Sequence, residues 1–263
     1  MRAISDCWAA FQEILPALVK ELPVLKRPAG DLHPVQGPVA RRMRRACDPF
    51  GALRFITPMA AVAGAVADEL IAGFDRPGVR RASINNGGDI ALHLGPDTRY
   101  TIGIWAQLER QWRRDTQRES VDRVFKVDHA MPVRGVATSG WRGRSFSLGI
   151  ADSVTVLAAD AAAADAAATL VANAVNCRFD GIVRAPAHIL RDDSDLTDLL
   201  VTVHVPALPA ELKCAALSAG RAEAERWRDR GLLYAAVLFL QGEVEVVLPQ
   251  RALQRTRFAT ARA

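Results

Sequence analysis

Residues 153–175 read SVTVLAADAAAADAAATLVANAV, and this stretch decides the fold of the 263-residue chain. The first five residues, Ser153 to Leu157, are mostly β-branched or apolar, which predicts a buried strand. Asp160 suits the N-cap position of a helix, and the alanine-rich run behind it is predicted to stay helical to about Val175. A strand that leads through a short loop into a packed helix indicates a domain of mixed α and β structure.

The rest of the chain alternates helical and strand-like segments. Apolar side chains at helical spacing, or small residues that run to a glycine, predict helices over 4–25, with a bend or break at Pro16, and over 58–74 and 209–230. Alternating or β-branched runs predict strands within 79–94, around a turn at 85–88, and over 99–105, 121–127, 199–205, 232–240 and 243–248. Proline and glycine predict a loop over 27–52, residues 107–119 an exposed loop or short helix, and 251–263 a frayed basic tail.

These elements predict an α+β fold in which antiparallel or mixed sheets pack against helices. The small residues between Thr57 and Phe74, Gly64 among them, predict a helix that a neighbouring element approaches closely. No repeat of fixed period and no low-complexity linker divides the sequence. We therefore expect a single domain over 1–263, and a division into two lobes stays open.

The composition excludes disorder as the main description of the chain, because half of the residues are apolar and 24% are charged. Four cysteines lie far apart, without the spacing of a zinc site or a disulfide framework, which favours a reducing compartment. No stretch of 18 uncharged apolar residues occurs, and acidic residues interrupt the N-terminal segment. We expect no membrane span, no secretory signal and a cytoplasmic location.

Basic residues number 34 against 29 acidic ones, and nearly all of them are arginine. Arginine grips phosphate through a planar fork of donors, so the surplus fits an anionic small ligand as well as nucleic acid. The arginine run within 41–45 is most typical of a solvated helix face. A nucleic-acid surface built from runs at 41–45 and 110–118 is the weakest hypothesis, because aromatic interleaving is sparse, and no nucleic-acid partner is expected.

Asp165 and Thr169 lie four residues apart in the predicted alanine helix, so they project from one helix face. A carboxylate and a hydroxyl one turn apart can share a hard cation, and Mg²⁺ prefers oxygen ligands together with waters and substrate phosphates. For this spacing alone, the favoured interpretation is a surface aspartate and a threonine that hydrogen-bonds back into its own helix.

Two further segments combine glycine with polar side chains. The run Asn86-Gly87-Gly88-Asp89 is typical of a hairpin turn, but it could also bring the backbone close to a ring or a phosphate. Residues 138–147, TSGWRGRSFS, hold hydroxyls, backbone amides and two arginines that could cradle an anion. A solvated loop explains the same composition, so both interpretations stay open. The five histidines have no metal-ligand spacing.

Four blocks follow in a fixed order: residues 59–68 (MAAVAGAVAD), 86–89 (NGGD), 137–140 (ATSG) and 165–169 (DAAAT). In this order they resemble the ApbE superfamily, which includes the FAD:protein FMN transferases. The longer phrases 55–64 (FITPMAAVAG) and 147–152 (SLGIAD) resemble an ApbE-like branch found in bacteria and archaea. The resemblance covers roughly residues 57–175.

The resemblance implies an ApbE-like fold that binds FAD, uses Mg²⁺ to split its diphosphate and, in transferase members, attaches FMN to a threonine of a protein acceptor. Asp165 and Thr169 match the family's metal-binding acid and threonine, the pair implied to be catalytic, and the metal-binding backbone carbonyl falls near Ala60. The matches to the flavin nucleotide site are Met59, Ala60, Asn86, Gly87, Gly88, Asp89, Ala137, Thr138, Ser139 and Gly140.

Two departures separate the chain from the transferase members. A histidine-led segment that ends in Asp-Pro-x-Thr-Gly is replaced by the shorter 144–152 (RSFSLGIAD), and the family lysine of the small-residue helix is replaced by Ala63. The leading hypothesis is an ApbE-like protein that binds FAD, FMN or another nucleotide diphosphate with Mg²⁺ and cleaves or transfers it. The alternative is a non-catalytic flavin- or metabolite-binding module that has lost the transferase loop. Enzymatic activity and oligomeric state stay open.

Overall fold

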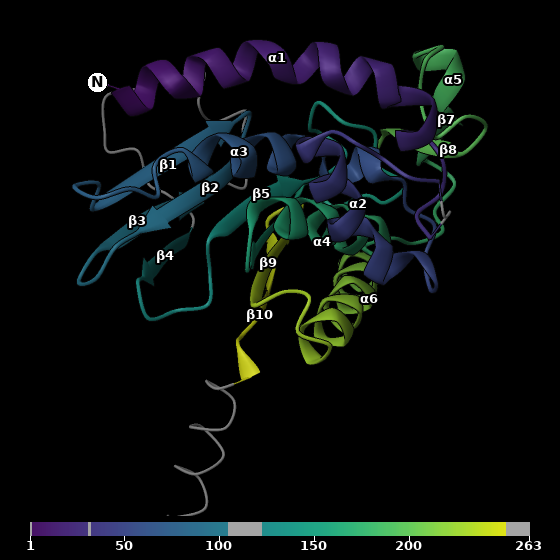
Figure 1. Ribbon diagram of the computed structural model, residues 1–263. Helices are drawn as coiled ribbons and strands as arrows, with labels where there is room; N and C mark the ends of the chain where they lie inside the picture. Colours follow the sequence, from purple (N-terminus) through teal and green to yellow (C-terminus); the bar gives the residue numbers. More distant parts are fainter. Residues whose placement is uncertain (1, 31–32, 105–122, 251–263) are drawn as a thin grey trace, which may run out of the picture.

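The computed structural model describes residues 2–30, 33–104 and 123–250, and one antiparallel sheet forms its centre (Figure 1). Six strands lie in the spatial order β1-β2-β5-β6-β9-β10, and every neighbouring pair runs antiparallel. Their bounds are Arg81–Asn86 (β1), Asp89–Leu94 (β2), Gly135–Ser139 (β5), Ser153–Ala158 (β6), Ala235–Leu240 (β9) and Glu243–Val247 (β10). All residues of β6 and β9 are buried, because the sheet is covered on both faces there.

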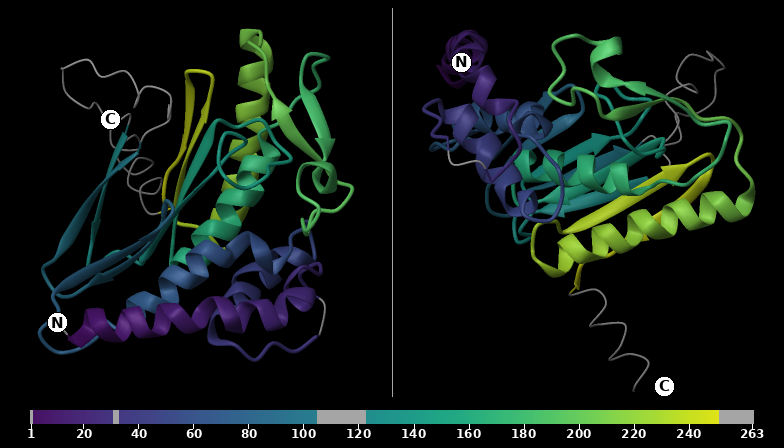
Figure 2. Two further views of the ribbon diagram at one scale, coloured as in Figure 1. Left: turned by 90° about the horizontal axis from the view of Figure 1, so that it is seen from above. Right: turned by 90° about the vertical axis from the view of Figure 1, so that its right-hand side faces the viewer.

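Three helices cover one face of the sheet (Figure 2): α3 (Val62–Ala72), α4 (Ala161–Ala174) and α6 (Ala210–Asp229). α3 packs on β1 and β2, α4 on β5 and β6, and α6 on β9 and β10. A short 3₁₀-helix, η1 (Pro58–Ala61), leads into α3. The side chains of α4 are mostly alanine and mostly buried, so this helix lies close to the sheet and to both neighbouring helices.

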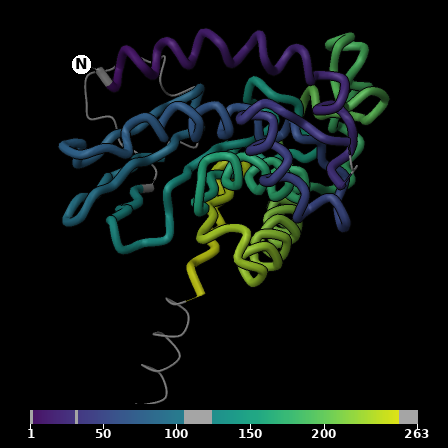
Figure 3. The backbone as a smooth tube through the Cα atoms, in the orientation of Figure 1, coloured from purple at the N-terminus to yellow at the C-terminus, as the bar shows by residue number. Residues whose placement is uncertain are grey.

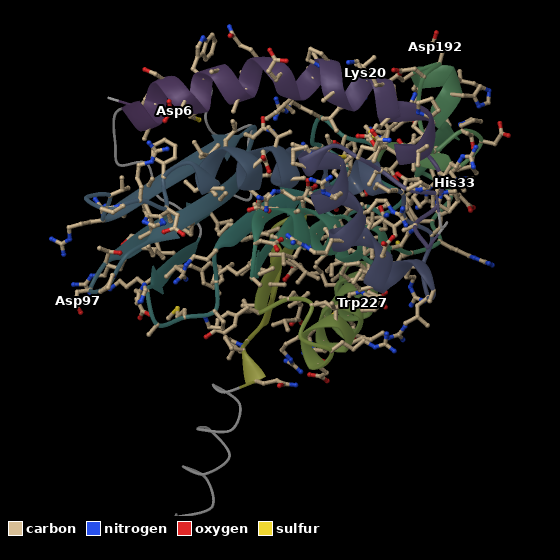
Figure 4. All side chains as sticks on the ribbon, in the orientation of Figure 1. Asp6, Lys20, His33, Asp97, Asp192 and Trp227 are labelled. Atoms are coloured by element: carbon tan, nitrogen blue, oxygen red, sulfur yellow. The ribbon has the colours of Figure 1, made fainter. Side chains whose placement is uncertain are left out.

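Two more helices form an outer layer over α3, namely α1 (Arg2–Leu25), which runs along the top of Figure 1, and α2 (Pro38–Gly51). Phe50 of α2 meets Trp227 of α6 edge to face, with 4.8 Å between the ring centroids. Both side chains are fully buried, and Figure 4 labels Trp227 on α6. This aromatic pair joins the outer layer to the helix layer on the sheet.

The opposite face of the sheet is covered by a separate two-stranded sheet of β3 (Arg99–Ile104) and β4 (Arg123–Asp128). Buried Val127 of β4 packs with Leu92, Val136 and Leu157 of the central sheet in one apolar cluster. Since Val136 and Leu157 face this cluster, the residues next to them in the strands face the helices.

A second two-stranded sheet, β7 (Val183–Pro186) and β8 (Leu200–His204), carries the one-turn helix α5 (Ala187–Leu190) between its strands. We call this unit the β7–β8 arm. The backbone tube in Figure 3 shows it beside the C-terminal end of α1. A hydrogen bond from the Lys26 ammonium to the carbonyl of Asp193 joins the two.

The predicted α+β fold is confirmed, and all paired strands are antiparallel rather than mixed. The loop predicted over 27–52 is wrong for 38–51, which form α2 because Pro38 begins the helix and apolar residues recur on its buried face. The break predicted at Pro16 is also wrong, since α1 continues through it. β7 and α5 were not predicted. The predictions for 107–119, for the arginines at 110–118 and for the tail 251–263 lie outside the described residues.

The arginine run of α2 lies on a solvated helix face, as predicted. Arg42 pairs with Glu69 at 2.8 Å, and Arg45 approaches Asp160 at 3.7 Å. These contacts neutralise part of the run within the molecule. In the described ranges, no helix combines the length and the apolar character that crossing a membrane requires.

Candidate functional site

A cavity of ≈ 340 Å³ opens where several of the sequence blocks that carry the resemblance meet in space. Its walls come from the end of α1, from η1 and the start of α3, from the β1–β2 turn, from the end of β5 and the loop after it, from one face of α4, and from the β7–β8 arm. These segments are far apart in the chain, and the helix layer brings them together beside one end of the central sheet.

Two carboxylates form the floor of this cavity. Asp165 of α4 accepts a hydrogen bond from the backbone amide of Gly64 at 3.0 Å, so it contacts the N-terminal end of α3. Asp89, at the start of β2, accepts one from the amide of Thr138 at 3.2 Å. Both carboxylates are therefore positioned by hydrogen bonds from backbone amides of α3 and β5.

The environment of the floor disfavours negative charge. Burial raises the pKa of Asp165 well above its ordinary value, and the charge of Asp89 raises it further. Burial also raises the pKa of Asp89 to about 6, although the Thr138 amide and the Arg144 guanidinium lower it in part. Within the described residues, no basic side chain pairs with Asp165. A cation at the floor would relieve this unfavourable charge.

Thr169 and Asn173 follow Asp165 along the same face of α4, one turn apart each, and both line the cavity. In the part of the chain that the structure describes, the Thr169 hydroxyl has no hydrogen-bond partner. The back-bond into its own helix, favoured from spacing alone, is therefore absent there. Asn173 is engaged instead, since its Oδ1 accepts from the Leu148 amide at 2.8 Å and the Ser147 hydroxyl at 3.2 Å.

The oxygen donors at the floor fit Mg²⁺ better than a softer metal. The cavity wall includes four groups with oxygen atoms, namely the carboxylates of Asp165 and Asp89, the hydroxyl of Thr169 and the backbone of Ala60. No group of three or more histidine, cysteine, aspartate or glutamate side chains suited to a metal occurs over 2–30, 33–104 and 123–250. An ion here would need backbone, hydroxyl, water or ligand oxygens besides the carboxylates, which is the usual coordination of Mg²⁺.

Basic side chains surround the cavity above this floor. Arg144 donates to the carbonyl of Gly87 at 2.9 Å. Lys26 comes from the end of α1, and Arg191 lies over the ring of Phe146 with its guanidinium carbon 5.1 Å from the ring centroid. Lys26, Arg144 and Arg191 thus offer positive charge within the same cavity as the acids, and Phe146 offers an apolar surface.

The NGGD block, residues 86–89, forms a hairpin turn and also contacts Arg144. β1 and β2 do form a hairpin through it, which confirms the turn. Gly87 has φ +72°, and a Cβ there would lie 1.6 Å from a guanidinium nitrogen of Arg144. Glycine is therefore required both by the backbone conformation and by the close approach of Arg144. In the structure, the side chain of Arg144, from the loop after β5, occupies the space that the sequence pattern left open for a ligand.

Most of the residues predicted from the resemblance meet in this one cavity: Met59, Ala60, Gly87, Asp89, Thr138, Ser139, Gly140, Asp165 and Thr169. Three do not line it. Asn86 instead donates through its side chain to the carbonyl of Ala63 at 3.1 Å, Gly88 donates its amide to the Asn85 side chain at 2.8 Å, and Ala137 is fully buried in the core. These three residues therefore support the wall of the cavity without lining it.

Thr138 and the loop after it contribute less than the composition predicted. The Thr138 hydroxyl is engaged with Thr155 at 2.8 Å on the neighbouring strand. Arg142 pairs with Asp152 at 3.1 Å, and Ser147 is buried. The residues of the proposed anion cradle that line the cavity are Thr138, Ser139, Gly140, Gly143, Arg144, Ser145 and Phe146.

Several wall residues were not found from the sequence. They come from the end of α1, the segment before η1 and the β7–β8 arm: Leu22, Lys26, Phe55, Arg191, Asp193 and Asp195. The Thr57 hydroxyl donates to the Asp195 carboxylate, which fixes the arm to the segment before η1. The charged run 191–195 (RDDSD) was the available signal, but its place beside the cavity depends on an arm whose first strand was not predicted.

The fold and the ordered blocks around one cavity define an ApbE-related protein. The family model described as "AbpE bacteria" matches residues 1–246, and the chain belongs to this family. The match covers all elements of the central sheet but the last residue of β10.

Several similar proteins carry the name UPF0280 protein. The protein of Methanosphaerula palustris is 40% identical over 144 residues, which are 54% of this chain and 55% of the relative. The protein of Methanopyrus kandleri is 38% identical over 136 residues, 51% and 48% of the two chains. That of Methanosarcina barkeri is 36% identical over 139 residues, 52% and 49%. The matched part spans about half the length of these curated relatives.

Proposed function

We propose that this protein binds a flavin nucleotide, FAD or FMN, or another nucleotide diphosphate, together with Mg²⁺, in the cavity between α3, α4 and the β7–β8 arm. One observation carries the proposal: the carboxylates of Asp89, which is buried, and Asp165, which is half-buried, lie with the Thr169 hydroxyl at the floor of a cavity that three basic side chains surround. The acids suit a divalent cation, and the basic groups suit the phosphates that such a cation accompanies.

The chain's own residues have separable roles in this proposal. Asp165, Thr169 and the Ala60 carbonyl would hold Mg²⁺, with Asp89 facing the same ion. When bound, Mg²⁺ neutralises a diphosphate and makes its phosphorus atoms easier to attack. Arg144 and Lys26 would orient the phosphates, and the partly exposed ring of Phe55 would pack on the apolar part of the ligand.

A second candidate, a binding module without catalytic activity, has its own support. The described lining of the cavity includes neither histidine nor cysteine, so proton transfer there would depend on carboxylates or on the Lys26 ammonium. Asp152, at the end of the shortened loop, accepts from the Gln241 amide at 2.5 Å and pairs with Arg142. Asp152 therefore has structural contacts and does not line the cavity.

The test combines binding and turnover in purified protein. FAD, FMN and ADP are titrated with and without Mg²⁺ by isothermal calorimetry, and AMP and FMN released from FAD are followed by chromatography. Asp165→Asn removes the floor carboxylate, and Asp198→Asn, whose side chain is 91% exposed on the arm, is the matched control.

The outcomes separate the two candidates. Mg²⁺-dependent binding that Asp165→Asn abolishes and Asp198→Asn leaves intact supports the proposed site, and release of AMP or FMN makes the protein an enzyme. Tight binding that survives both a chelator and Asp165→Asn favours the non-catalytic module. If none of the three nucleotides binds to the wild type, the proposal is wrong. A protein acceptor for FMN is sought only after turnover is found.

A further inference from the structure

Helix α1 carries a continuous apolar stripe with the spacing of a coiled-coil seam. Its large apolar side chains recur at alternating steps of four and three residues, at Ile4, Trp8, Phe11, Leu15, Leu18, Leu22 and Leu25. This is the repeat of the a and d positions of a heptad, which keeps one face of a helix toward a partner helix.

The rest of the molecule covers only the C-terminal half of this stripe. Leu25 is fully buried, and Leu18 and Leu22 are half-buried, the latter in the wall of the cavity. The N-terminal half stays exposed among the described residues: Ile4 is 67% exposed, Trp8 61%, Phe11 47% and Leu15 69%. The rings of Trp8 and Phe11 stack with 5.9 Å between their centroids, so the two aromatic side chains form one continuous surface.

We propose that this half-stripe, Ile4–Leu15, pairs antiparallel with the same half-stripe of a second copy of the chain. The spacing is self-complementary about a two-fold axis between residues 9 and 10. Ile4 then lies opposite Leu15 of the second copy, and Trp8 lies opposite Phe11. An interface that uses the same patch on both copies needs this symmetry.

Charge along the helix favours a second copy over a charged partner. The positions that flank the half-stripe hold Ser5, Cys7, Gln12 and Ile14, none of which is charged at neutral pH. Asp6 lies on another side of α1, where it pairs with Arg76 at 3.1 Å. Two copies can therefore approach along the half-stripe without bringing like charges together.

The size of the surface sets the expected affinity. Four large side chains from each copy, over about 17 Å of helix, make an interface at or below the small end of specific ones. We expect a reversible dimer rather than an obligate one, with monomers at low protein concentration. Because Leu22 of α1 and Lys26, the residue directly after α1, both line the cavity, pairing would also hold the helix that positions them.

The test measures mass in solution by sedimentation equilibrium on the full chain, from about 1 to 100 µM. The wild type is expected to shift from monomer to dimer over this range. Trp8→Lys alone and Phe11→Glu alone are each expected to remain monomeric. An equimolar mixture of the two is expected to form a heterodimer, because in the antiparallel arrangement the introduced lysine faces the introduced glutamate.

Ile189→Asp is the matched control, since Ile189 on α5 is 67% exposed like Ile4 but lies on the arm. This variant is expected to dimerise like the wild type, and far-ultraviolet circular dichroism checks that each variant is folded. A monomeric wild type at the highest concentration overturns the proposal and would mean that the half-stripe does not bind a second copy of the chain. Dimers in the single variants overturn it too. Failure of the mixture to associate overturns the antiparallel register.

Discussion

The N-terminal ends of α3 and α4 cross in the middle of the molecule, and each is capped by an aspartate from the other helix. Asp68 of α3 accepts hydrogen bonds from the amides of Ala161 and Ala162 at 3.0 and 2.8 Å. Asp165 of α4 accepts from the amide of Gly64 at 3.0 Å. Both acids satisfy donors that the first turn of a helix leaves unpaired, and both sit at the positive end of a helix dipole.

The two ends differ in what lies on the other side of the carboxylate. Asp68 is 6% exposed, each of its oxygens accepts a hydrogen bond from an amide of α4, and it does not line the cavity. Asp165 faces a cavity, a second acid and the Thr169 hydroxyl, which has no hydrogen-bond partner among the residues that the structure describes. The same interaction is thus structural at one end and forms part of a candidate site at the other, and only the surroundings separate the two.

Gly64→Ala should have the largest effect, because it breaks the crossing itself. A Cβ at this position would lie 2.2 Å from the carbonyl oxygen of Ala161, which is backbone and cannot swing aside. We expect a loss of about 3 kcal/mol in the free energy of unfolding, measured by urea denaturation. Gly73→Ala is the control, since its added Cβ would meet nothing closer than 3.5 Å. Equal stability of the two variants would show that the crossing is not tight.

Asp68→Ala should come next. It leaves two buried amides of α4 without partners, and Asp160, which accepts from the Ala163 amide at 2.8 Å, cannot reach them as well. The expected loss is about 2 kcal/mol, because a cap and a buried acceptor are removed together. Glu69→Ala, next in sequence but in a surface pair with Arg42, should cost less than about 1 kcal/mol. A larger loss at Glu69 would contradict the capping role.

The pH dependence of stability offers a finer test of the same cap. Burial raises the pKa of Asp68 to about 6 against an ordinary value of 3.8, so the folded protein binds this proton more tightly than the unfolded chain. Stability contributed by Asp68 is therefore full below about pH 4 and is lost as the pH rises through about 6. The stability difference between the wild type and Asp68→Asn should fall on the order of 1–3 kcal/mol from pH 4 to 7. A constant difference would mean that the carboxyl titrates normally.

These two helix ends also show how far sequence reasoning reaches. The strand over 153–157, the capping role of Asp160 and the close approach at Gly64 follow from local rules and are confirmed. The reciprocal use of Asp68 and Asp165 does not, because it depends on which helices cross and at which residues. Asp68 stood inside a block that carried the resemblance, yet no pattern in the sequence separated its role from that of Asp165.

The candidate site divides in the same way. The floor residues lie in the ordered blocks and were predicted, whereas Lys26, Arg191 and Asp195 come from α1 and the β7–β8 arm. The α2 segment was missed because its proline and glycine content outweighed an apolar period that only packing against η1 and α3 makes visible. Sequence patterns therefore indicate the floor and Arg144, whereas the tertiary structure adds Lys26 and Arg191.

Asp165→Asn should change stability little, within about 1 kcal/mol, because the amide oxygen can still accept from Gly64 and the unfavourable buried charge is removed. The same variant should lose Mg²⁺ binding, measured by calorimetry with Mg²⁺ alone. Asp68→Asn, although less stable, should keep its Mg²⁺ affinity when assayed well below its melting temperature. The reverse result would exchange the roles assigned to the two helix ends.

Thr169→Val should have the smallest effect on stability and still distinguish the two ends. Valine keeps the β-branched shape of threonine, and the hydroxyl that it removes makes no hydrogen bond within the described residues, so we expect a change within about 0.5 kcal/mol. If the hydroxyl contributes one oxygen to the ion, Mg²⁺ affinity should fall several-fold, while Thr169→Ser should retain it because serine restores the oxygen. Unchanged affinity in Thr169→Val, together with loss in Asp165→Asn, would confine the cation to the two carboxylates. The residue one turn after Asp68 is Ala72, which has no hydroxyl, so such a result would leave the cavity as the one difference between the two helix ends.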